Sequence, residues 1–175
     1  MKYFPSHKRG FTLIETIIYL ALYALIMTGV LVSVYGIFGS ASRNQTKAMV
    51  QEEGSYLTGK IDWALTGVQT ISAPVANDSG DTLTVTKYDT SVGNPIIISV
   101  SAGNVTIKRG AAAARVINNS NTRISCPVGG CFTHVAASGD GINPESLAAS
   151  FVISATTSEG LAFSQPFATV KYLRR

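Results

Sequence analysis

The start of the chain is divided into a short basic stretch and a long apolar one. Lys2, Lys8 and Arg9 come first, and residues 16–39 then contain no charged side chain. A helix over that stretch would be about 36 Å long, which is enough to cross a hydrocarbon layer of about 30 Å. The pattern therefore predicts a membrane-spanning helix. A buried core helix is the alternative, but core helices are seldom apolar on every face over such a length.

Beyond residue 40 the apolar positions become periodic, with spacings of seven, four, three and four residues that place them on one face of a helix. These positions are Val50, Leu57, Ile61, Ala64 and Val68. Charged residues such as Glu52 and Lys60 lie between them. The pattern predicts one helix that begins at Phe11 and ends near Thr66, with its first half in the membrane and its second half packed under a globular head.

After Gly67 the sequence changes to short runs rich in Val, Ile, Thr and aromatic residues, which favour β-strands. Strands are predicted at residues 82–88, 96–100, 105–108, 131–136, 147–156 and 162–172. We expect an antiparallel sheet whose apolar face covers the second half of the helix. The predicted fold class is thus α+β, a long N-terminal helix packed on a C-terminal antiparallel β-sheet head.

Several segments of the head have the composition of turns. Ala102-Gly103-Asn104 and Ser158-Glu159-Gly160 are predicted to connect hairpins, and residues 77–81, which read Asn-Asp-Ser-Gly-Asp, are predicted to form a loop. Pro166 lies inside the last predicted strand. Because proline cannot donate a ladder hydrogen bond, that strand is expected at the edge of a sheet or at a bulge.

The charges that flank the apolar stretch predict its orientation. The basic leader precedes it, whereas Arg43 and Lys47 follow it only after the uncharged residues 40–42. Positive flanks stay in the cytoplasm, so the leader is expected inside and everything after residue 40 outside. A cleaved secretory signal is an alternative, with Gly39-Ser40-Ala41-Ser42 as its cleavage site. The apolar region of such a signal, however, is only about 7 to 15 residues long.

Glu15 is the only acidic or basic side chain between Phe11 and Gly39. A carboxylate in a membrane span costs up to about 2.5 to 3.5 kcal/mol on insertion scales, and such residues usually mark a function. One interpretation is local, because Thr12-x-x-Glu15 fits a capping box at the start of a helix. The other is that Glu15 pairs with a cation elsewhere.

The residues Lys8-Arg9-Gly10-Phe11-Thr12-Leu13-Ile14-Glu15, followed by an uncharged span, resemble the class III signal of type IV pilins and type II secretion pseudopilins. The resemblance implies that a prepilin peptidase cleaves between Gly10 and Phe11 and N-methylates Phe11. It also implies that Glu15 pairs with the amine of Phe11, in its own subunit or in a neighbouring one. Such a pair would fix the axial stagger of one helix against the next.

This resemblance implies four parts of the chain: a cleaved cytoplasmic leader at residues 1–10, a transmembrane and filament-core helix at 11–39, the amphipathic second half of the helix at 40–67, and a β-rich head at 68–175. The protein is then a structural subunit and not an enzyme. It is expected to cross the inner membrane once, with its N-terminus in the cytoplasm and its head outside. An inner-membrane assembly platform then moves it into an extracytoplasmic helical filament of pilins or pseudopilins.

Two features favour a minor, J-like subunit over a major one: the large β content of the head, and Val32 where many major pilins have a helix-kinking proline. Two alternatives stay open. One is an unprocessed single-pass protein that anchors an extracytoplasmic binding domain in the membrane. The other is a minor pilin for DNA uptake in competence.

The net charge argues little for a nucleic-acid partner. The chain has 14 Lys plus Arg and 10 Asp plus Glu, and loss of Lys2, Lys8 and Arg9 with the leader leaves 11 (14 − 3) against 10. The mature protein is therefore near neutral, and nucleic-acid binding is not expected. The candidate residues for a DNA-binding patch are Lys108, Arg109, Arg115 and Arg123.

Cys126 and Cys131 are five residues apart, with a tight-turn sequence between them. Outside the cytoplasm such a pair is expected to form a disulfide that pins a loop. A zinc site with His134 is an alternative that needs more ligands, and the spacing departs from the C-x-x-C of redox motifs.

Other candidate sites are weaker, and we expect neither a cofactor nor a metal. Asp78, Asp81 and Asp89 are candidate calcium ligands, but they lack the regular EF-hand spacing. His134 and Asp140 are residue types that occur with a serine in catalytic triads. We do not expect a triad here, because no nucleophile motif such as G-x-S-x-G occurs.

Overall fold

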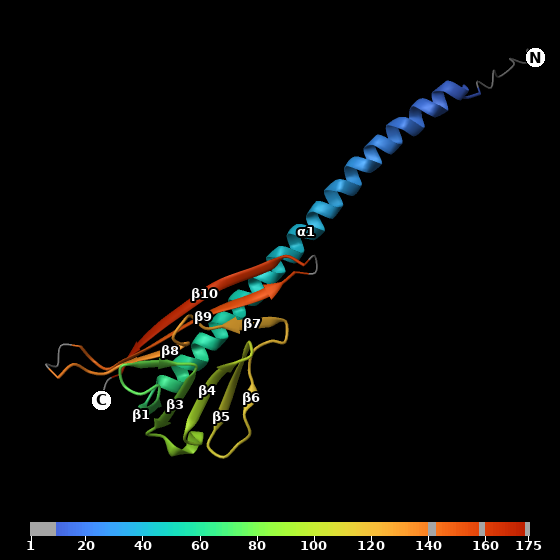
Figure 1. Ribbon diagram of the computed structural model, residues 1–175. Coiled ribbons are helices and arrows are strands. Elements are labelled where there is room, and N and C mark those ends of the chain that lie inside the picture. Colours follow the sequence, from blue (N-terminus) through green and yellow to red (C-terminus); the bar gives the residue numbers. More distant parts are fainter. Residues whose placement is uncertain (1–9, 140–142, 158–159, 174–175) are drawn as a thin grey trace, which may run out of the picture. The chain divides into compact units, whose positions relative to one another are not determined.

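The computed structural model describes residues 10–139, 143–157 and 160–173 (Figure 1). The predicted leader apart from Gly10, the candidate triad residue Asp140 and the predicted hairpin residues Ser158 and Glu159 lie outside the described residues. By its internal contacts the chain divides into two compact units, residues 1–41 and 42–175. We describe each unit by itself.

The first element is the predicted helix, α1, which runs over Leu13–Leu65. Its N-terminus lies next to Thr12, and its C-terminus is followed by Gly67 in the left-handed conformation (φ +68°), which glycine adopts without strain at a helix end. Lys87 also donates from its Nζ to the carbonyl oxygen of Trp63 in the last turn, at 2.8 Å. These ends confirm a helix from near Phe11 to near Thr66.

The part of α1 in the first unit is apolar on all sides. Residues 16–38 are exposed throughout, although most of them are aliphatic or aromatic. Among the described residues, α1 is the one helix long and apolar enough to cross a membrane. A surface of this kind needs lipid or other apolar helices to cover it.

The part of α1 in the second unit is amphipathic, as predicted. Val50, Leu57, Ile61 and Ala64 are all buried. Val68 is buried as well, but it begins the first strand instead of extending the helix. The core of the head therefore lies between this face of α1 and the sheets, with Leu83, Ile98, Phe132, Leu147 and Ile153 among its fully buried side chains.

The head contains two antiparallel five-stranded sheets, where the sequence predicted a single sheet. The first has the order β1-β3-β4-β5-β6 (Figure 1). Its strands are β1 (Val68–Ala73), β3 (Thr82–Lys87), β4 (Ile96–Ser101), β5 (Asn104–Arg109) and β6 (Arg115–Val116), and a short 3-10 helix, η1 (Thr90–Val92), lies between β3 and β4. The predicted hairpin at Ala102-Gly103-Asn104 is present, with Ser101 paired to Asn104. Ala102 and Gly103 both have positive φ (50° and 80°), as a two-residue hairpin turn requires.

The second sheet has the order β10-β9-β8-β2, and β7 also pairs with β9. Its strands are β2 (Asp78–Gly80), β7 (Thr122–Ser125), β8 (Phe132–Val135), β9 (Ser146–Thr156) and β10 (Ala162–Tyr172). β8 pairs with residues 146–149 of β9 and β7 with residues 152–155, so the two short strands follow one another along one edge of the long strand. Alternate residues of β9 are buried, which gives this sheet its apolar face.

Strand β10 runs along α1 within the head. Lys47 lies over the ring of Phe163, Gly54 lies against the ring of Phe167, and Lys171 forms an ion pair with Asp62 at 2.6 Å. The three β10 residues are four apart, so they share one face of the strand. Pro166 lies in this edge strand, as predicted, and the pairing of β10 with β9 runs through it without a bulge.

The loop predicted at residues 77–81 is wrong, because Asp78–Gly80 forms β2 and pairs with β8. The residues of this segment have the local composition of a turn. The strand forms because it pairs with β8, which is more than fifty residues away in the sequence. Strands β1, β6 and β7 were not predicted. All six predicted strands are present, and the α+β fold class is confirmed.

Candidate assembly site at the start of the helix

Thr12 caps the N-terminus of α1. The backbone N–H of Glu15 donates to the carbonyl oxygen of Thr12 at 3.1 Å and, at 3.4 Å, to its Oγ1. The N–H of Thr16 donates to the same carbonyl at 3.2 Å. This is one half of the capping box anticipated from Thr12-x-x-Glu15. Glu15 consequently occupies the first turn, where the helix dipole favours a negative charge.

The carboxylate of Glu15 does not complete the capping box. Among the described residues its hydrogen-bond partner is Tyr19, one turn further on, whose hydroxyl donates to Oε1 at 3.5 Å. That bond is long, and a carboxylate has room for several donors. Glu15 therefore retains acceptor capacity for a stronger partner. The contact with Tyr19 was missed in the sequence, although its spacing of four residues is the one at which helix side chains meet.

Phe11 and Gly10 precede the helix and are exposed. Phe11 is 72% exposed, and its ring meets the ring of Tyr19 edge to face with centroids 6.1 Å apart. A Cβ added at Gly10 would meet no described atom within 4 Å. The fold itself therefore does not require glycine at position 10. Packing within the described structure therefore does not explain why residue 10 is a glycine.

Hydroxyl groups along the apolar part of α1 are satisfied within the helix. Thr16 donates to the carbonyl of Leu13 at 2.8 Å, Thr28 to that of Ala24 at 2.8 Å, and Ser33 to that of Gly29 at 2.9 Å. Such bonds let a hydroxyl enter an apolar medium without losing its partner.

The predicted disulfide between Cys126 and Cys131 is present. It closes the loop between β7 and β8. The N–H of Cys131 donates to Oδ1 of Asp81 at 3.1 Å, and Gly130 lies so close to the backbone of Gly80 that a Cβ would come within 2.5 Å of it. Asp81 and the two sulfurs lie within metal-ligand distance of one another, but sulfurs joined in a disulfide are not thiolate ligands.

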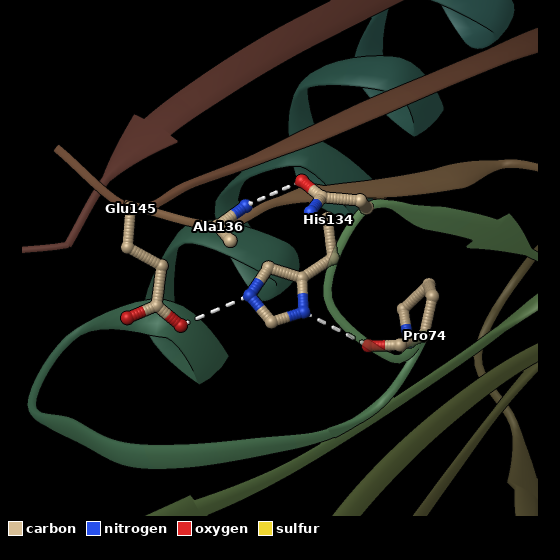
Figure 2. A network of polar contacts seen from close by, with 5 residues as sticks. Pro74, His134, Ala136 and Glu145 are labelled. Carbon is tan, nitrogen blue, oxygen red and sulfur yellow. Dashed lines mark hydrogen bonds and ion pairs between the residues drawn. The ribbon is translucent and has the colours of Figure 1, made fainter. Parts of the chain in front are cut away.

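His134 is held by contacts on both sides of its ring (Figure 2). It is 4% exposed, with Nδ1 2.9 Å from the carbonyl oxygen of Pro74 and Nε2 2.9 Å from Oε1 of Glu145. Both nitrogens are thus engaged, and neither is available to a serine or a zinc ion. These partners were not predicted, because they belong to two other segments of the head.

The three candidate calcium ligands do not form a common site. Asp78 accepts from the N–H of Ser79 at 2.8 Å, and Asp81 accepts from Cys131 as described. Asp89 caps η1, and hydrogen bonds from the hydroxyl and then the N–H of Ser91 hold the pKa of its carboxyl below the usual value. Within the part of the chain that the structure describes, these acids are not grouped as metal ligands.

The four candidate DNA-binding cations are also not assembled into one surface. Lys108 and Arg109 are neighbours on β5 and so point to opposite faces of it. The guanidinium of Arg109 lies 4.7 Å from the ring centroid of Trp63, and Arg123 donates to the carbonyl of Ala102 at 3.3 Å.

Lys87 is the second cation at Trp63, with Nζ 4.5 Å from the ring centroid. Burial, and to a smaller extent Arg109, lower the pKa of Lys87, while Asp89 partly opposes the shift. These basic residues therefore stabilise the end of α1.

Comparison with known families matches residues 5–31 to the prokaryotic N-terminal methylation motif. No curated protein and no solved structure matches the chain. The matched segment includes Gly10, Phe11 and Glu15 and ends within the apolar part of α1. The apolar helix and this motif together support anchoring in a membrane. This motif supports a type IV pilin-like protein with a class III signal at its N-terminus.

Proposed function

We propose that the protein is a structural subunit of a type IV pilus or of a type II secretion pseudopilus. The observation that carries this proposal is the methylation motif at residues 5–31, placed directly at the start of a long helix with an exposed apolar surface. Lipid covers that surface before assembly, and the corresponding helices of neighbouring subunits cover it in the filament. No catalytic group is needed for this role.

In this proposal a prepilin peptidase hydrolyses the peptide bond between Gly10 and Phe11 and methylates the amine that is released. The exposure of both residues supports access by the enzyme. The open space around Gly10 supports a role in recognition, since the fold would accept a side chain there. The leader at residues 1–10 is then lost, and residues 11–175 form the mature subunit.

Glu15 is the proposed assembly residue. Cleavage creates a cation on Phe11, four residues before the Glu15 carboxylate, in a helix face that is otherwise apolar. Opposite charges attract strongly in such a medium, and a pair between subunits fixes their stagger. The weak contact from Tyr19 supports this role, because it leaves most of the acceptor capacity of Glu15 unused.

The proposed topology places residues 11–39 across the inner membrane, with residues 40–67 and the head, 68–175, on the extracytoplasmic side. Basic residues before the span and a disulfide in the head support this orientation. An inner-membrane platform then transfers the subunit into the filament. The unbroken helix at Val32 and the β-rich head support a minor, J-like subunit.

Mass spectrometry of the mature protein from membranes tests the proposal against an unprocessed membrane anchor. The expected chain begins at Phe11 and carries one additional methyl group, whereas an intact Met1 contradicts the proposal. A Gly10→Val variant is the matched control. It should remain uncleaved while its thermal unfolding is unchanged, because the fold has space for the side chain.

A further inference from the structure

Two basic side chains lie on α1 just beyond the apolar span. Arg43 and Lys47 are the first charged residues after Glu15, and they are one helical turn apart, so they share one face of α1. Arg43 is four residues past Gly39, about 6 Å along the helix axis, and Lys47 is about 12 Å past it. The headgroup layer of a bilayer adds about 5 to 8 Å on each side of the hydrocarbon core. Arg43 therefore lies within the headgroup layer, and the long side chain of Lys47, which points back toward the start of the helix, reaches that layer from just beyond it.

The two cations line a hollow together with the end of the β9–β10 hairpin. Its lining residues are Arg43, Lys47, Thr157, Leu161, Ala162 and Phe163. Thr157 fixes this end of the hairpin, since its N–H donates to the carbonyl of Leu161 at 2.9 Å and its Oγ1 accepts from the N–H of Leu161 at 3.1 Å. Leu161 is 46% exposed beside the cations. The hollow thus combines positive charge with apolar surface.

The charge of this hollow is not balanced by described residues. The ion pairs among them join His134 to Glu145 and Lys171 to Asp62, and neither includes Arg43 or Lys47. Lys47 instead lies 5.7 Å from the ring centroid of Phe163, which leaves its charge open to an anion. Glu159 lies outside the described residues. Two like charges one turn apart oppose helix formation unless an anion lies near both.

We propose that this hollow binds the phosphate of an anionic membrane phospholipid. Arg43 supplies the forked donors that match phosphate oxygens, Lys47 supplies a second charge, and Leu161 supplies apolar surface beside them. A lipid is the occupant because the hollow begins within the headgroup layer. The site requires only that α1 is anchored in a membrane, so it stands whether or not the protein enters a filament.

The test measures lipids retained by the full chain, purified from mixed bilayers of phosphatidylcholine and phosphatidylglycerol, by native mass spectrometry. The wild type is expected to retain phosphatidylglycerol preferentially. Arg43→Gln/Lys47→Gln should lower that preference by about fivefold for each charge removed. Lys60→Gln/Arg115→Gln removes the same charges from elsewhere in the head and should retain the wild-type preference.

Circular dichroism of both double variants checks that the head remains folded. Equal retention of the two lipids by the wild type, or an unchanged preference in Arg43→Gln/Lys47→Gln, overturns the proposal. Displacement of the lipid by millimolar glycerophosphoglycerol also overturns it, because the site then binds a free phosphate ester. The same holds if the cations prove to bind an acidic protein while lipid retention is unaffected.

Discussion

Gly54 on α1 lies directly against the ring of Phe167 on β10, so that a Cβ added at Gly54 would overlap the ring atoms. The same ring is stacked on Phe151 of β9, with centroids 5.9 Å apart. The helix therefore approaches the second sheet through a position that only glycine can occupy with the present packing.

We expect Gly54→Ala to destabilise the head by about 1 to 3 kcal/mol, because the added methyl forces Phe167 out of its stack. Thermal unfolding followed by circular dichroism measures the change. Gly59→Ala is the matched control, since a Cβ there meets no described atom within 4 Å. It should leave stability unchanged or raise it by about 0.5 to 1 kcal/mol, because alanine favours helix. Equal effects of the two changes would contradict this packing argument.

Glu15→Gln removes the charge and keeps the size of the side chain. The variant should be cleaved and methylated like the wild type, because the cleavage site precedes it, but it should enter filaments poorly. Quantitative blotting of membrane and sheared-filament fractions measures both steps. Glu52→Gln, an exposed acid in the second half of α1, serves as the control and should assemble normally. Normal incorporation of Glu15→Gln would refute the charge pair while leaving processing intact.

The Cys126–Cys131 bridge closes a short loop, so its contribution to stability is modest. Chain entropy for a loop of this size gives about 2 kcal/mol. Reduction with dithiothreitol should therefore lower the thermal midpoint of the head without unfolding it at room temperature. Cys126→Ala/Cys131→Ala should show a lowered midpoint that no longer responds to the reductant. A wild-type midpoint that is insensitive to reductant would show that the bridge adds nothing to stability.

Glu53 is a site of pH dependence. Burial raises the pKa of its carboxyl, and the N–H of Asn119, which donates to Oε1 at 3.2 Å, only partly offsets the shift. The folded state thus holds this proton to a higher pH than the unfolded chain does. The ionised form opposes folding, so the contribution of Glu53 to stability falls as pH rises through its folded pKa.

Glu53→Gln keeps an oxygen for Asn119 and removes this titration. The stability of the variant relative to the wild type should therefore increase between about pH 3 and about pH 7. Urea unfolding at several pH values measures the difference. A difference that decreases with pH for Glu53→Gln would reverse the assigned direction of the shift.

The sequence predicted α1 and the β9–β10 hairpin well, because each depends on a local signal. The unbroken apolar run and the periodic face after it define the helix, and Thr12 and Gly67 fix its ends. Runs rich in Val, Ile, Thr and aromatic residues do the same for the strands. The division into two sheets and the existence of β2 depend on pairing between distant segments, which no local pattern specifies.

The same contrast between local signals and contacts of distant segments applies to the candidate site. The methylation motif is a linear signal, so the segment that contains Gly10, Phe11 and Glu15 was recognised in the sequence. The contacts of His134 were not, because Pro74 and Glu145 reach it from distant segments of the chain, one just after β1 and one just before β9. Tyr19 was missed for a different reason. It lies one helical turn from Glu15, at a spacing where side chains meet, but a tyrosine within an apolar helix was interpreted as an apolar residue and not as a hydrogen-bond donor.

In the proposed function, the internal hydrogen bonds of Thr16, Thr28 and Ser33 affect how the subunit leaves the bilayer. Each hydroxyl takes its acceptor with it, so the exchange of surrounding lipid for surrounding protein breaks none of these bonds. The work of extraction is then set by apolar contacts, which both environments offer, and by the charge on Glu15. The free energy of such a helix therefore differs little between lipid and protein surroundings. Small differences in packing then decide which of the two surroundings it occupies.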